Sequence, residues 1–137
     1  MINKKRILSV VLSSVLTVSA LGMMIFANTD QNYSVTLPAL QTKVTCSSDT
    51  KDGDYSYANN KFQYYDGTTS ATFWLDSYNG TSWVYNSYQD YTIAESSSFT
   101  KMYYNIKPAN NVSVRLRGKN AGMSLYGIDI YGTVNFN

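Results

Sequence analysis

The chain has 137 residues, of which 44% are hydrophobic and 15% are charged, and it contains 13 Tyr, one Cys and no His. This length allows one domain. The absence of His excludes a His-dependent catalytic triad and a His-ligated metal site. A single Cys also excludes an intramolecular disulfide.

The N-terminal segment 1–27 has the composition of a secretory signal peptide. Lys4, Lys5 and Arg6 form a positive n-region, an apolar stretch from residue 7 to residue 26 follows, and Ala27 supplies a small residue for cleavage. An uncleaved membrane anchor is the alternative, because about 20 apolar residues span a bilayer. The Ser and Thr residues within the stretch, and the polar residues that follow it, favour cleavage.

Cleavage changes the charge of the protein. The whole chain has 11 Lys and Arg against 9 Asp and Glu, and three of the basic residues lie in segment 1–27. Residues 28–137 therefore carry a net charge of −1. Because nucleic-acid binding needs clustered Lys and Arg, we expect no nucleic-acid partner. We expect residues 28–137 to form a single monomeric domain that is secreted or extracellular, with association to the cell envelope as an option.

The remaining sequence alternates with a period of two in runs rich in Tyr, Thr, Val, Phe and Trp. Turn residues such as Gly, Asn, Asp and Pro separate the runs, and Gln89–Ser98 is the one segment in which we expect a helical turn. The pattern predicts an all-β domain, an antiparallel β-sandwich of about 7–8 strands preceded by a signal peptide, with a barrel as the alternative. The expected strands are Tyr33–Leu37, Lys43–Ser47, Lys61–Asp66, Ala71–Tyr78, Thr81–Tyr88, Phe99–Ile106, Val112–Gly118 and Ser124–Phe136.

Asn79-Gly80 predicts a two-residue hairpin, because both central positions of such a turn favour positive φ. The alternation around it places Leu75 and Val84 in the core, and it places Trp74, Trp83 and Tyr85 on the opposite face. The C-terminal strand alternates so regularly that we expect it inside a sheet rather than at an edge. The expected pairs are Leu75–Val84, Phe73–Asn86, Trp74–Tyr85 and Asp76–Trp83, and the expected core is Phe73, Leu75, Val84, Val112, Val114, Leu116, Ile128, Ile130 and Val134.

The abundance of Tyr and Trp is the feature that points to a function. These side chains offer broad contact area with a polar end, which favours recognition surfaces, although Tyr is also an ordinary strand residue. Trp74, Trp83 and Tyr85 are predicted to lie on one sheet face, where they would stack on sugar rings or contact a protein. Arg115 and Arg117 would add polar contacts if their strand shares that face. We predict these five residues as the binding site.

Carboxylates supply the remaining candidates for chemistry. Asp76 and Asp129 lie within predicted strands and are the candidates for acid–base catalysis, but a solvent-facing strand residue is the simpler interpretation. Asp49, Asp52 and Asp54 surround a glycine, but their spacing departs from the helix–loop–helix calcium site, which favours a solvated acidic turn. We therefore expect no enzyme activity, no metal site and no cofactor.

Three segments of the chain resemble a known group of proteins. They are Thr72-Phe73-Trp74-Leu75, Met102-Tyr103-Tyr104-Asn105 and the run from Asn111 to Asn120. They are similar to an uncharacterised family of small proteins secreted by Gram-positive bacteria. That resemblance covers about half of the chain, implies an occasional association with bacteriocin systems, and carries no catalytic residue that can be transferred.

Together these features predict a small secreted protein that binds rather than catalyses. Its expected target is a cell-envelope or extracellular one, such as a cell-wall glycopolymer or an envelope protein, reached through an aromatic-rich sheet surface. A bacteriocin-like or membrane-active protein acting on a target membrane is the first alternative, because alternating strands also form membrane-inserting hairpins. A hydrolase that depends on the carboxylates of Asp76 or Asp129 is the second.

Overall fold

The computed structural model describes residues 30–64 and 70–137, so the predicted signal peptide lies outside the described residues. The described residues form strands and loops, and no helix among them is long and apolar enough to cross a membrane. The strands are β1 (Gln31–Leu37), β2 (Val44–Thr50), β3 (Tyr57–Tyr64), β4 (Ser70–Tyr78), β5 (Trp83–Tyr85), β6 (Tyr91–Ala94), β7 (Thr100–Tyr103), β8 (Ser113–Asn120) and β9 (Ile128–Asn135).

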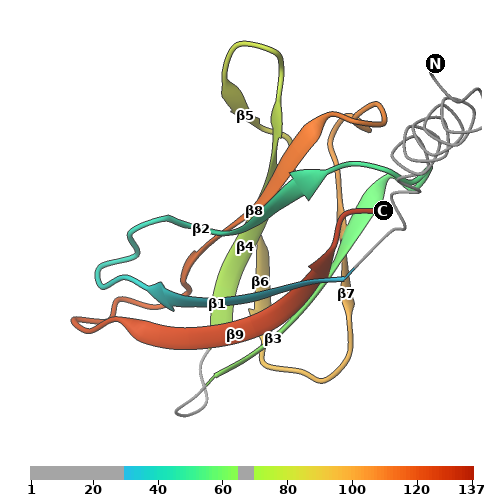
Figure 1. Cartoon of the computed structure of the whole chain (residues 1–137). Helices are drawn as coiled ribbons and strands as arrows, with labels where there is room; N and C mark the ends of the chain where they lie inside the picture. The colour runs from blue at the N-terminus through green and yellow to red at the C-terminus, as the bar shows by residue number, and fades with distance from the viewer. Residues whose placement is uncertain (1–29, 65–69) are drawn as a thin grey trace, which may run out of the picture.

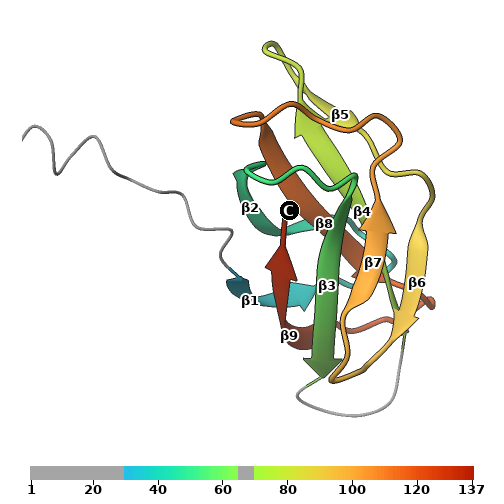
Figure 2. The ribbon, with the colours of Figure 1, turned by 90° about the vertical axis from the view of Figure 1, so that its right-hand side faces the viewer.

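The strands form two antiparallel sheets that pack face to face (Figure 1). One sheet has the order β1-β9-β3-β7, and the other has the order β2-β8-β4-β5, with β6 paired to the same edge of β4 as β5. Figure 2 shows β3 and β7 side by side in one layer with β4 and β8 behind them. Because the chain crosses between sheets at most connections, the order is that of a jelly roll. The prediction of an antiparallel β-sandwich is confirmed.

The core fills the space between the sheets and follows the predicted alternation. The aromatic rings of Phe62 on β3 and Phe73 on β4 meet at its centre, with centroids 5.0 Å apart. Strand β9 lies between β1 and β3, as its regular pattern predicted. Six of the nine predicted core residues are fully buried, and these are Phe73, Leu75, Val114, Leu116, Ile130 and Val134.

The other three predicted core residues differ from expectation. Ile128 is half-buried and packs against the core, and Val112 is half-buried at the start of β8. Val84 is 37% exposed, so its prediction as a core residue is wrong. In Figure 1, β5 and the end of β4 extend beyond the four-stranded sheet. The inner side of this hairpin faces the loop before β8 instead, and Val84 lines an open hollow there with Ile106 and Pro108.

The predicted two-residue turn at Asn79-Gly80 is also wrong. Such a turn favours positive φ at both residues, but of the two only Gly80 has it, at 93°. The side-chain Oδ1 of Asn79 instead accepts hydrogen bonds from the backbone N–H groups of Thr81 (3.0 Å) and Ser82 (2.9 Å). This Asx-type turn opens the loop to four residues. Tyr78 therefore pairs with Trp83, and Asp76 with Tyr85.

Two strand predictions need correction as well. The segment in which we expected a helical turn contains β6, whose residues pair with the start of β4. The last strand begins at Ile128 rather than at Ser124, and the residues before it form a loop. The end of the predicted strand Lys61–Asp66 falls in segment 65–69, outside the described residues.

Candidate functional site

All five predicted site residues lie on the outer face of the five-stranded sheet. Strand pairing sets Trp74 opposite Arg117, and it sets Asp76 opposite both Arg115 on β8 and Tyr85 on β5. Trp83 lies opposite Tyr78, two residues further along β4 than the predicted partner Asp76. Because side chains alternate between faces, a register shift of two residues keeps the aromatic face but moves Trp83 away from Trp74.

Trp74 belongs to this face but is not an exposed contact residue. Its exposed fraction is 6%, and the ammonium group of Lys43 lies 5.5 Å from its ring centroid. Its neighbour across the strands, Arg117, donates a hydrogen bond of 3.0 Å to the hydroxyl of Thr45. The predicted row of three open aromatic side chains is therefore reduced to Trp83 and Tyr85.

An ion pair fixes the centre of the face. The Arg115 guanidinium donates to Oδ2 of Asp76 from Nε at 2.9 Å and from Nη2 at 2.8 Å, and both side chains are largely buried. The guanidinium carbon lies 4.4 Å from the ring centroid of Trp83. The other neighbour of Trp83 is Tyr78, whose ring meets it edge-on at 5.6 Å. Trp83 is thus held in place by a cation and a second aromatic ring.

Replacing Asp76 with asparagine is expected to lower the free energy of unfolding by roughly 1.5–3 kcal/mol, since hydrogen bonds to charged groups contribute about that much. Asn keeps the shape of the side chain and removes the charge that Arg115 needs in a largely buried position. The matched control is Asp54→Asn, because the pair of Asp54 with Lys107 is exposed and long at 3.5 Å. Urea unfolding of both variants measures the difference, and equal stability would show that the Arg115 pair contributes nothing.

A hollow of about 270 Å³ opens beside Trp83, lined also by Ser48, Asp49 and Thr50 of β2 and by Ser113 of β8. The carboxylate of Asp49 is engaged by Gln31 Nε2 and by the backbone N–H of Thr50, each at 2.8 Å. The hydroxyl groups of Ser48, Thr50 and Ser113 have no hydrogen-bond partner within the part of the chain that the structure describes. The hollow therefore combines an aromatic wall with hydroxyl groups that are free to bond a ligand.

Tyr85 lies at the outer edge of the same face. It is 55% exposed, and its hydroxyl donates a hydrogen bond of 2.9 Å to Asp90. Partial burial, together with this hydrogen bond to a carboxylate, raises the pKa of Tyr85 to about 12. Its hydroxyl stays protonated at neutral pH, so it contributes a neutral ring and a polar end.

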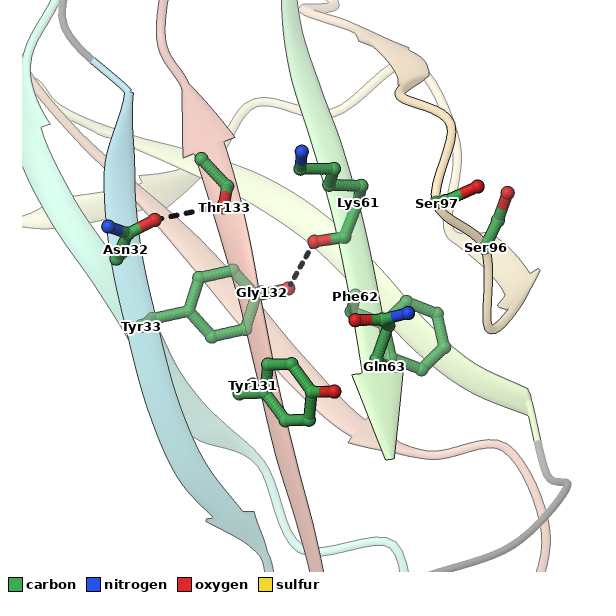
Figure 3. A pocket seen from close by; sticks show the side chains of 10 residues that line it. All are labelled: Asn32, Tyr33, Lys61, Phe62, Gln63, Ser96, Ser97, Tyr131, Gly132 and Thr133. Atoms are coloured by element: carbon green, nitrogen blue, oxygen red, sulfur yellow. Dashed lines mark hydrogen bonds between the residues drawn. The ribbon is translucent and has the colours of Figure 1, made fainter. Parts of the chain in front are cut away.

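Sequence reasoning missed a larger hollow, of about 360 Å³, on the outer side of the four-stranded sheet (Figure 3). Its floor includes Gly132, and Lys61 and Tyr131 stand beside it, with Ser96 and Ser97 contributed by the loop after β6. Among the described residues Lys61 is the one charged residue that lines it, and its ammonium group lies 4.6 Å from the ring centroid of Phe99. These residues come from three strands and a loop that are distant in the sequence, so no local sequence pattern predicts the hollow.

The other predicted acidic residues do not come together. Asp129 lies on β9 of the four-stranded sheet, where it accepts a hydrogen bond from Thr36, so it is on a different sheet from Asp76. Across the described ranges no three His, Cys, Asp or Glu side chains form a cluster that would hold a metal ion. Between Asp49 and Asp54 the chain instead buries Lys51, which donates from Nζ to the carbonyl of Gly53 at 2.5 Å.

Comparison with known proteins supports the fold. No family model matches the sequence, and no curated protein is similar to it. The crystal structure of the Yersinia pseudotuberculosis-derived mitogen is similar, with a TM-score of 0.53 and 14% sequence identity over 81% of this chain and 88% of that one. A likeness at this identity shows the fold alone, and the chain shares its all-β architecture with that protein.

Proposed function

We propose that this protein is a small secreted binding module, without catalytic activity, that recognises a cell-envelope or extracellular target through the outer face of its five-stranded sheet. The observation that carries the proposal is the hollow beside Trp83, which joins an aromatic ring to three hydroxyl groups that have no hydrogen-bond partner among the described residues. Secretion is supported by the composition of segment 1–27.

A glycan is the ligand class that best fits this chemistry. The C–H faces of sugar rings pack against indole rings, and their hydroxyl groups exchange hydrogen bonds with Ser and Thr side chains. Trp83 is held by Arg115 and Tyr78 before any ligand arrives, so little side-chain freedom is lost on binding. A cell-wall glycopolymer is therefore the proposed target. The mitogen of similar fold is too distant in sequence to suggest a ligand for this chain.

Sedimentation with purified insoluble Gram-positive cell walls tests the proposal, using the chain from Asn28 onward, which holds all nine described strands. We expect saturable binding, which Trp83→Ala weakens roughly 30-fold, because an anchoring Trp contributes about 2 kcal/mol or more. Tyr131→Ala, in the hollow of the four-stranded sheet, is the matched control and is expected to bind normally.

Two other results of this binding experiment would contradict the proposal. Loss of binding in Tyr131→Ala with normal binding in Trp83→Ala would move the site to the four-stranded sheet. Absence of binding to walls and to isolated teichoic acid by the unmodified chain would contradict a wall glycopolymer as the target. Thermal unfolding of both variants verifies that they remain folded.

A further inference from the structure

The three most exposed large apolar side chains of the described structure lie in one loop at one end of the sandwich, and a fourth exposed apolar side chain lies in the loop beside it. Met123, Leu125 and Tyr126 in the loop between β8 and β9 are 81%, 77% and 79% exposed, and Leu40 in the loop between β1 and β2 is 60% exposed. The two loops lie next to each other at the left of Figure 1. We call these four residues the apolar tip. None of them lines a hollow described above.

Hydrogen bonds hold the apolar tip together. The backbone N–H of Leu40 donates to the carbonyl of Ser124 at 2.8 Å, and Gln41 Nε2 donates to the carbonyl of Ala121 at 3.0 Å. Within the second loop, the Ser124 hydroxyl donates to the carbonyl of Tyr126 at 2.8 Å and accepts from its N–H at 3.1 Å. Several polar groups of the loops are thus satisfied internally, while the large side chains point to solvent.

Basic residues flank the apolar tip on one side. Lys43 ends the first loop, directly before β2, and Lys119 lies in the last two residues of β8, directly before the second loop, so both are next to strands of the five-stranded sheet. In the described part of the chain neither ammonium group is within salt-bridge distance of a carboxylate. Among the described residues, Asp129 near the start of β9 is an acidic residue close to the loops, but it lies on the other sheet, where it accepts a hydrogen bond from Thr36.

From this arrangement we infer that the apolar tip inserts into the surface of an anionic lipid bilayer. A bilayer accepts protruding apolar side chains without a complementary pocket, and it favours backbone groups that are already hydrogen-bonded. A Tyr side chain suits the boundary between headgroups and acyl chains, and lysines behind it attract anionic headgroups. This membrane contact is separate from the glycan site, because β8 runs from Ser113, at the Trp83 hollow, to Asn120, at the tip.

Co-sedimentation with vesicles tests this inference, using the chain from Asn28 onward and vesicles of equal parts phosphatidylglycerol and phosphatidylcholine. We expect binding that the double variant Met123→Ser/Leu125→Ser lowers by about 100-fold, since each apolar side chain contributes roughly a factor of ten. Vesicles of phosphatidylcholine alone are expected to bind more weakly, because they lack the charge that the lysines attract.

Ile106→Ser is the matched control. Ile106 is 73% exposed in the loop before β8, at the opposite end of that strand, so its replacement is expected to leave vesicle binding unchanged. Trp83→Ala should also bind vesicles normally, which separates this inference from the proposed glycan site. Equal binding by the double variant and the Ile106 variant would overturn the inference. Failure of the unmodified chain to bind vesicles would also overturn it. That outcome is expected if the apolar tip instead joins two copies of the chain.

Discussion

Replacing Phe73 with alanine is expected to lower the free energy of unfolding by about 3–5 kcal/mol, which is the usual cost of removing a buried Phe ring. The side chain is fully buried on the inner face of β4, where its ring meets Phe62 at 5.0 Å. On the same side, Gly118 of β8 leaves room for the ring, since a Cβ there would lie 3.2 Å from two of its atoms. The truncation would leave a cavity between the two sheets.

Phe99→Ala provides the matched control for this prediction. Phe99 is 42% exposed, so the same truncation removes little buried area and should change stability by much less. Chemical denaturation followed by circular dichroism measures both variants. A loss in Phe73→Ala no larger than that in Phe99→Ala would contradict the position of Phe73 at the centre of the core.

Replacing Gly132 with alanine is the second change with a large expected effect. A Cβ at this position of β9 would lie closer than 3.0 Å to the carbonyl oxygen of Lys61 on β3 and to the hydroxyl group of Tyr33 on β1. The Lys61 oxygen belongs to the backbone of the neighbouring strand, so it cannot move away alone. Overpacking of this kind costs about 1–3 kcal/mol, and we expect the upper end of that range.

The side chain of Tyr33 adds to the cost of a substitution at Gly132. Its ring passes beside Gly132, and its hydroxyl donates a hydrogen bond of 2.9 Å to Oδ1 of Asn60. A side chain on Gly132 would therefore disturb a buried polar contact as well as the strand spacing. Burial raises the pKa of Tyr33, so the neutral hydroxyl persists well into alkaline solution.

Gly122→Ala is the control for the glycine prediction. Nothing lies within 4 Å of a Cβ built at Gly122, in the loop between β8 and β9, so the stability change is expected within about 0.5 kcal/mol. The melting temperatures of the two variants provide the comparison. Similar melting temperatures would mean that β9 shifts to accommodate the extra methyl group.

The fold was largely predictable because alternation is a local property. In Leu75, Val114, Leu116 and Ile130 the burial follows from the period of two alone, since successive side chains of a strand point to opposite faces. The same rule placed Trp74, Trp83 and Tyr85 on one face, whereas the strand pairing added Arg115 and Arg117 to it. It also predicted that β9 would lie inside a sheet.

The predictions failed where hydrogen bonds in the loops, rather than alternation, decided the structure. The loop after β4 follows the hydrogen bonds of the Asn79 side chain, which compete with the turn that Asn-Gly favours. The alternation through Leu125 and Tyr126 suggested a strand, but hydrogen bonds within the loop and to the loop of Leu40 hold these residues outside the sheet.

By itself, therefore, the sequence determined the class of fold, most of the core and the face shared by the three aromatic residues of the predicted site. The tertiary structure alone decided that Trp74 is buried beside Lys43, and that Trp83 stands next to hydroxyl groups from β2 and β8. The physical reason is that alternation specifies the direction of each side chain within its own strand. The burial of a side chain and its neighbours in a binding site depend on strands that are distant in the sequence. The register and position of those strands are fixed only when the two sheets pack.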